Sequence, residues 1–174
     1  MAFINRMVGQ DYIDKIREYL DYVEEHLENV RLAFIELSNA CEGMWWVSDD
    51  MSWHNLRMDV EWHDVSKLSQ AELVPYSDEF YPTEHEPMEW PDNGFAKAWE
   101  HHKRNNNHHH ESLKDDLDVV HMVIDWTAMG YKFGDTAQSY YEANKDKIEL
   151  ADGQVELIYE IFDRVNKYSV KADS

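Results

Sequence analysis

The chain has 174 residues, of which 43% are hydrophobic, and a formal net charge of -20. The length predicts a single ordered domain over residues 1–174, and the negative charge disfavours binding to duplex nucleic acid or to an anionic membrane surface. A single cysteine excludes an internal disulfide and a cage of thiolates for zinc, so a metal would need imidazole and carboxylate ligands.

Helices are expected along most of the chain, with no strand and no membrane-spanning stretch. From Tyr12 to Leu37, apolar residues recur at steps of three and four, which is the period of an amphipathic helix. The segment Ser69-Gln70-Ala71-Glu72 has the spacing of a capping box and predicts a short helix that ends before Pro75. The predicted fold is all-α, a compact bundle of six to seven helices: this short one and helices over 12–37, 52–67, 93–104, 113–133, 136–147 and 152–167.

The stretch 75–91 carries all four prolines and is expected to be a long loop, because proline removes a helix hydrogen bond. A loop of this length is typical of a functional lid or of a segment packed down by its own aromatic rings. Tyr81 and Trp90 on this loop are therefore candidates for covering a substrate. Tryptophans at helical spacing usually belong to the core, which we expect of Trp62 and Trp126.

Adjacent His63 and Asp64, at the end of the helix predicted over 52–67, can offer an imidazole nitrogen and a carboxylate oxygen to one metal. The apolar face of that helix places His63 on its buried side, where a metal would satisfy both polar groups. The alternative is a helix end satisfied by hydrogen bonds alone. His26 lies on the apolar face of the first helix, where a histidine is either a metal ligand or a hydrogen-bonded core residue.

The helix predicted over 113–133 offers further polar groups on one face. Asp125 interrupts an apolar run, where an unpaired charge is costly, so we expect it to bind the metal. Asp118 and His121 share the face of Asp125. They are candidates for supporting the ligands from behind, or else polar residues at the margin of a buried helix.

A histidine on one helix, a His-Asp pair on a following helix and an aspartate on a later helix together resemble the HD superfamily of metal-dependent phosphohydrolases. Further motifs resemble an uncharacterised family of small HD-type proteins from phages and bacteria, over residues 20–148. These motifs are His63-Asp64-Val65-Ser66-Lys67-Leu68-Ser69, Pro75-Tyr76, Ala98-Trp99, His101-His102, Asn107-His108-His109, Asp125-Trp126 and Lys132-Phe133-Gly134-Asp135-Thr136.

The resemblance implies that His26, His63, Asp64 and Asp125 hold a divalent metal ion, which activates a water for attack on phosphorus. Mixed imidazole and carboxylate ligands do not distinguish Mn, Fe, Co, Ni, Zn or Mg. Asp64 and Lys67 are the candidate catalytic residues. HD relatives often carry an acidic catalytic residue one turn after the pair, where this chain has Lys67. Lys67 would either hold a phosphate or pair with Asp64, so the general acid or base stays open.

The histidine-rich segment 100–111 exceeds what a one-metal HD site requires. It is interpreted as ligands of a second metal, as a phosphate clamp or as an exposed polar loop. Some HD branches use additional histidines between the pair and the last aspartate. Within the segment, His102, His109, Lys103 and Arg104 are the candidates for a second metal or a phosphate.

The resulting hypothesis is a cytoplasmic phosphohydrolase, located in the host cytoplasm if a phage encodes it, that acts on a nucleotide or another small phosphorylated substrate. Two alternatives stay open. The first is an acidic binding or inhibitor protein without catalysis on the same scaffold, which the charge of -20 favours. The second is a di-iron oxygenase. The sequence does not distinguish a monomer from an oligomer.

Overall fold

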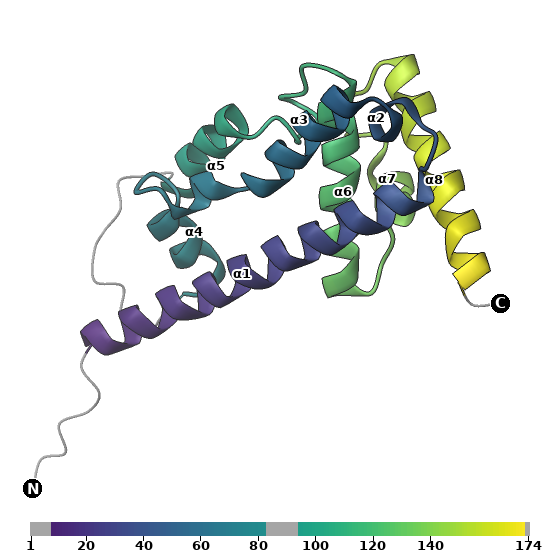
Figure 1. Ribbon diagram of the computed structural model, residues 1–174. Helices are drawn as coiled ribbons and strands as arrows, with labels where there is room; N and C mark the ends of the chain where they lie inside the picture. Colours follow the sequence, from purple (N-terminus) through teal and green to yellow (C-terminus); the bar gives the residue numbers. More distant parts are fainter. Residues whose placement is uncertain (1–7, 83–93, 173–174) are drawn as a thin grey trace, which may run out of the picture. The chain divides into compact units, whose positions relative to one another are not determined.

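The computed structural model describes residues 8–82 and 94–172, and these ranges contain eight α-helices, one 3-10 helix and no strand (Figure 1). The predicted all-α class is confirmed. No helix in the described ranges has the length and apolarity needed to cross a membrane. The elements are α1 (Val8–Ala40), α2 (Trp45–Ser48), α3 (Asp50–Glu61), η1 (Val65–Leu68), α4 (Leu73–Phe80), α5 (Gly94–Asn105), α6 (Asp116–Phe133), α7 (Ala137–Asn144) and α8 (Asp152–Ala172).

The described residues divide into two compact units, and each unit draws on separate stretches of the chain. Unit 1 comprises residues 8–25, 64–82 and 94–105, which include the first half of α1 with η1, α4 and α5. Unit 2 comprises residues 26–63 and 106–172, which include the second half of α1 with α2, α3, α6, α7 and α8. The single domain over residues 1–174 stays a prediction.

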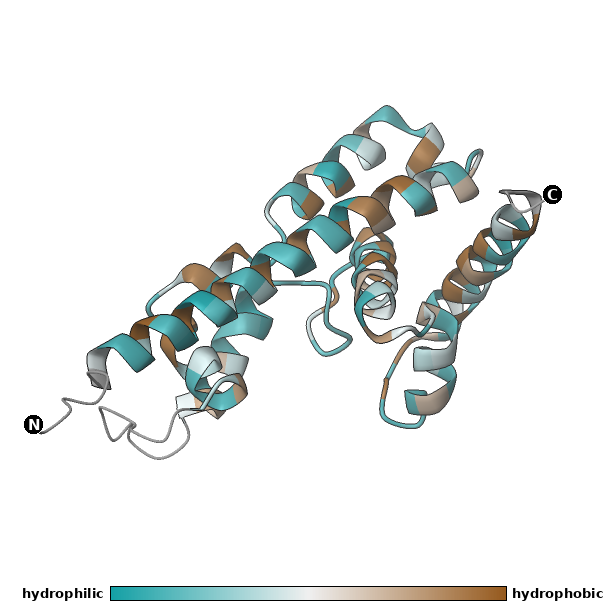
Figure 2. Ribbon diagram, turned by 90° about the horizontal axis from the view of Figure 1, so that it is seen from below, coloured by the Kyte–Doolittle hydropathy of each residue, from teal (hydrophilic) through white to brown (hydrophobic). Residues whose placement is uncertain are grey.

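Unit 2 is built around α6, whose residues are apolar on most sides. A helix of this kind must be covered on several faces, and side chains from α1, α3 and α8 do so. Figure 2 shows hydrophobic and hydrophilic residues along the same helices, as amphipathic elements around a shared core require. The buried core residues include Val30, Leu37, Trp46, Leu56, Val119, Val120, Met122, Ile124, Ile158 and Ile161.

Unit 1 is held together largely by aromatic rings. The ring centroid of Tyr76 on α4 lies 6.3 Å from that of Tyr19 on α1 and 5.1 Å from that of Phe95 on α5. Phe80 and Phe95 meet edge to face at 5.5 Å. These contacts fix α4 against α1 and α5 and leave the polar residues of η1 beside them.

The loop predicted over 75–91 is wrong at its start, because α4 runs from Leu73 to Phe80. Pro75 lies in the first turn of this helix, where the missing N–H would have no helical partner in any case. The short helix predicted to end before Pro75 is wrong for the same reason. Tyr81 follows α4 and is half-buried against Tyr19, with ring centroids 6.3 Å apart. The remaining part of the predicted lid, with Trp90, lies outside the described residues.

The helix predicted over 52–67 is shorter than expected, since α3 ends at Glu61 and η1 follows as a separate turn. Asp64 separates them in the left-handed conformation, with φ of 55° and ψ of 14°. The core position predicted for Trp62 is wrong, because its side chain is 65% exposed where the helix ends. Trp126 is buried, as predicted, within the core of unit 2.

Candidate metal centre

Three segments of unit 2 bring together two histidines and one aspartate. His26 lies on α1, His63 directly follows the end of α3, and Asp125 lies on α6. The Nε2 atoms of His26 and His63 are 3.0 Å apart. Asp125 Oδ1 lies 3.2 Å from His26 Nε2 and 3.6 Å from His63 Nε2. Residues separated by up to about a hundred positions in the sequence thus bring three possible ligand atoms within 3.6 Å of one another.

The spacing of these three atoms fits a divalent metal ion. Bonds of about 2.1 Å would place neighbouring ligand atoms about 3.0 Å apart in an octahedron and about 3.4 Å apart in a tetrahedron. The observed separations of 3.0, 3.2 and 3.6 Å cover this range. The two histidines are almost completely buried. The donor set of two imidazoles and one carboxylate is one that first-row transition metals accept.

Two further histidines support His63 from behind. The Nδ1 atom of His63 lies 3.0 Å from Nε2 of His121, so one of these nitrogens donates a hydrogen bond to the other. A proton on His63 Nδ1 leaves Nε2 with its lone pair directed at the ligand cluster. The ring of His108 stacks on that of His63, with centroids 4.3 Å apart. His121 thus contacts His63, its supporting role stays a prediction, and His108 adds a group that was not among the candidate residues.

The electrostatics of Asp125 reflect its histidine neighbours. Burial raises the pKa of this carboxyl, but the hydrogen bond from His26 and the fields of His63 and His108 outweigh burial and bring the pKa well below its usual value. Asp125 is therefore an ionised carboxylate. An anionic oxygen beside two imidazole nitrogens is what a cation requires.

A second polar cluster lies within unit 1 and centres on His102 of α5. His102 Nδ1 donates to Glu72 Oε2 over 2.9 Å, and His102 Nε2 lies 3.3 Å from Asp64 Oδ1. Lys67 Nζ contacts the other oxygen of Asp64 at 2.6 Å. The side chains of His102, Asp64 and Glu72 are all almost fully buried. A carboxylate can only accept, so Glu72 fixes the proton on Nδ1 and orients Nε2 toward Asp64.

Glu72 was not expected to have this role, since the capping-box pattern assigned it to a helix start. Its carboxylate instead accepts hydrogen bonds from His101 at 2.6 Å, His102 at 2.9 Å and Ser66 at 3.0 Å. Burial raises the pKa of Glu72, but these three hydrogen bonds outweigh it and lower the pKa overall. No local sequence pattern identifies a carboxylate whose two histidine partners lie on another helix about thirty positions away.

Tyr19 and Tyr76 are buried beside the carboxylates of unit 1. Burial raises the pKa of both phenols, and the negative charges of Asp64 and Glu72 raise it further, so both stay protonated. Neither hydroxyl has a hydrogen-bond partner among the described residues. Buried hydroxyls of this kind are usually satisfied by ordered water or a ligand.

The other predicted residues take varied positions. Lys103 on α5 pairs with Glu100 at 2.8 Å and lies over the ring of Trp99, while Arg104 is exposed. His109 belongs to unit 2, where its ring centroid lies 4.4 Å from that of His108. Asp118 accepts a hydrogen bond from the backbone N–H of Lys114 over 2.7 Å. The candidates for a second metal or a phosphate therefore belong to different units. Asp118 accepts a hydrogen bond from the backbone just before α6.

The fold and the site define an all-helical protein with buried clusters of histidine and carboxylate. The chain belongs to a family of unknown function (DUF5662), whose model matches residues 15–164. Neither the curated proteins nor the solved structures give a match to the chain. The matched range includes every residue of both clusters.

Proposed function

We propose that the protein is a metal-dependent phosphohydrolase of the HD superfamily that acts on a nucleotide or another small phosphorylated substrate. The observation that carries the proposal is the convergence of His26 Nε2, His63 Nε2 and Asp125 Oδ1 within 3.0 to 3.6 Å in unit 2. Mutual distances of this size between three buried donors are expected around one ion and are unfavourable for three lone pairs without a proton or cation between them.

A divalent metal at this triad would supply Lewis acidity and a more acidic bound water. Two neutral imidazoles and one carboxylate leave one positive charge on such a centre, which attracts an anionic phosphoryl group into an otherwise acidic protein. In the tautomer in which His63 Nδ1 donates to His121 Nε2, the lone pair of His63 Nε2 is available to the metal. Asp125 is ionised and supplies the anionic oxygen.

The resemblance to HD proteins assigns Asp64 as a further ligand and, with Lys67, as a catalytic residue, and both assignments stay predictions. Of the two roles expected for Lys67, the ion pair of 2.6 Å with Asp64 favours pairing with the carboxylate. This pair neutralises a carboxylate that is almost fully buried. Beside Lys67, His102 is a second side chain near Asp64 that carries a proton, because its Nδ1 atom donates to Glu72.

The proposal is tested by metal content and phosphate release. The purified protein, stripped with a chelator and reloaded with Mn, Fe, Co, Ni, Zn or Mg, is assayed against a panel of nucleotides. His63→Ala and Asp125→Asn should lose both bound metal and activity. His54→Ala is the matched control, because His54 is an exposed histidine on α3. Full activity of the two cluster variants, or an equal loss in His54→Ala, would contradict the proposal.

A second candidate function rests on the same triad. Two histidines and one carboxylate also bind iron in oxygenases that leave coordination positions open for oxygen and substrate. Oxygen consumption by the iron-loaded protein, without phosphate release from any nucleotide, would favour this oxygenase. Bound metal without turnover in either assay would favour a binding protein.

A further inference from the structure

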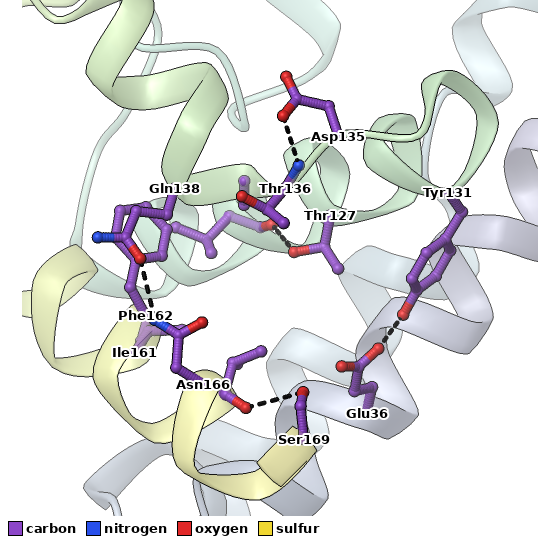
Figure 3. Close-up of a pocket in the computed structure, with 13 residues that line it drawn as sticks. Glu36, Thr127, Tyr131, Asp135, Thr136, Gln138, Ile161, Phe162, Asn166 and Ser169 are labelled. Atoms are coloured by element: carbon purple, nitrogen blue, oxygen red, sulfur yellow. Dashed lines mark hydrogen bonds between the residues drawn. The ribbon is translucent and has the colours of Figure 1, made fainter. Parts of the chain in front are cut away.

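Unit 2 contains a pocket that is formed by other residues than those of the candidate metal centre. Its volume is about 150 Å³, and α1, α6, α7 and α8 contribute the lining side chains. Figure 3 shows Gln138 and Asn166 on one side, Tyr131 and Glu36 on the other, and Thr127 between them. The polar groups of the pocket therefore face one another across a gap.

The size and floor of the pocket suit one small ring. Apolar side chains of Val123, Ile161, Phe162 and Val165 line it. An engineered apolar cavity of about 150 Å³ in another protein holds a single benzene molecule. A molecule with one aromatic ring therefore fills this space, and burial of its faces against the floor supplies the hydrophobic part of the binding energy.

The charges around the pocket select against anions. Glu36 and Asp135 are among the thirteen lining residues, and none of those thirteen is a lysine, arginine or histidine. Glu36 Oε2 accepts from the hydroxyl of Tyr131, which leaves Oε1 for another donor. An acidic rim of this kind favours a ligand that is neutral or cationic and that donates hydrogen bonds.

An amide pair on the opposite side adds directional contacts. Asn166 Nδ2 donates to Gln138 Oε1 over 3.0 Å, and this bond orients both amides. This leaves Asn166 Oδ1 directed toward the gap, while Gln138 Nε2 points away from it (Figure 3). Asn166 Oδ1 is therefore a second acceptor for a ligand that donates hydrogen bonds.

We propose that this pocket binds a single aromatic ring carrying an amino group, of the aminopyrimidine type. The ring lies on the apolar floor, and its amino hydrogens donate to the Glu36 carboxylate and to Asn166 Oδ1. The site goes beyond the proposed hydrolysis and does not depend on it. It gives the protein a second means of recognising a small molecule, through shape and hydrogen bonds.

Calorimetry or chemical-shift mapping with 2-aminopyrimidine and benzoate, in buffer with a chelator, tests the proposal without any turnover. The wild-type protein should bind 2-aminopyrimidine at least tenfold more tightly than benzoate. Benzoate is also a single ring of similar size, but it is an anion that the acidic rim should repel. Val165→Trp fills the pocket and should weaken binding at least tenfold. Glu36→Gln removes the anionic acceptor and should weaken it about tenfold.

Two matched controls accompany these variants. Val170→Trp places the same side chain on α8 at a residue that is 72% exposed. Glu28→Gln removes an exposed carboxylate from α1. Both should bind 2-aminopyrimidine as the wild type does. Equal affinity for benzoate, unchanged binding in a folded Val165→Trp variant, or no binding by the wild type at millimolar concentration would overturn the proposal.

Discussion

Replacing Asp125 with asparagine should remove most of the stabilisation of the protein by metal, because Asp125 supplies the only anionic oxygen of the triad in unit 2. A ligand that binds only the folded state at one hundred times its Kd adds about 2.7 kcal/mol to the free energy of unfolding. For a chain of this length, 1 kcal/mol corresponds to a shift in Tm of about 2–4 °C, so the wild type should gain about 5–11 °C.

The magnitude expected for the variant follows from the loss of affinity. Removing a group that only supports a ligand costs about 10- to 100-fold in metal affinity, so loss of a direct anionic ligand should reach at least the upper figure. At the same metal concentration, a Kd raised about 100-fold leaves only about 0.4 kcal/mol of stabilisation, or a shift in Tm below about 2 °C.

Differential scanning calorimetry of the chelator-treated protein, with and without added metal, measures this difference. The metal concentration is set at one hundred times the wild-type Kd from a separate titration. His54→Ala should keep the full shift, since His54 is exposed on α3. A full shift in folded Asp125→Asn, or none in the wild type with any divalent metal, would show that the triad is not a metal site.

Three further results are expected. Glu72→Gln should lower the free energy of unfolding by about 1–3 kcal/mol in urea titrations, because it replaces a buried carboxylate that accepts from three side chains with a neutral group that has one acceptor oxygen. Gly130→Ala should destabilise by about 1–3 kcal/mol in the same titration, since its Cβ would lie 2.5 Å from the backbone oxygen of Asp135. Cys41 should resist iodoacetamide until the protein unfolds, because burial raises its pKa from 9.0 to about 12. The unfolded thiol ionises first, so the free energy of unfolding should fall as pH rises from 9 toward 12.

Each of these expectations has a control or a contrary outcome. Glu79→Gln alters an exposed carboxylate on the same helix as Tyr76 and should change stability little. Alanine normally stabilises an exposed helix relative to glycine by up to about 1 kcal/mol, so a more stable Gly130→Ala would contradict the close approach. Alkylation of Cys41 at the rate of a free thiol in the folded protein would mean that its burial is wrong.

The helices whose apolar residues recur regularly could be predicted from the sequence, but two of the turns between them could not. The period from Tyr12 to Leu37 indicated most of α1 because burial of one face dictates it. Pro75 misled the prediction, since proline ends a helix in its interior and is tolerated in its first turn. Trp62 misled it because the helical face ceases to be defined where α3 ends.

Part of the candidate site could be predicted from the sequence in the same way. His26 and Asp125 interrupt apolar faces, and such an interruption is visible in a sequence because a polar group there needs a partner. Glu72 and His108 lie outside regular apolar patterns, and only the packing of distant segments brings them to their histidine partners. Local periodicity therefore identifies groups on long helices and misses those on turns and connecting segments.

The division of the chain also sets an order of events during synthesis. The chain leaves one unit for the other after residues 25, 63 and 105, so neither unit is a continuous segment that truncation can isolate. His26 and His63 emerge from the ribosome well before Asp125 does. A nascent chain that has not yet released α6 therefore carries both histidines without their carboxylate. The triad of His26, His63 and Asp125 can therefore come together only after α6 has been synthesised.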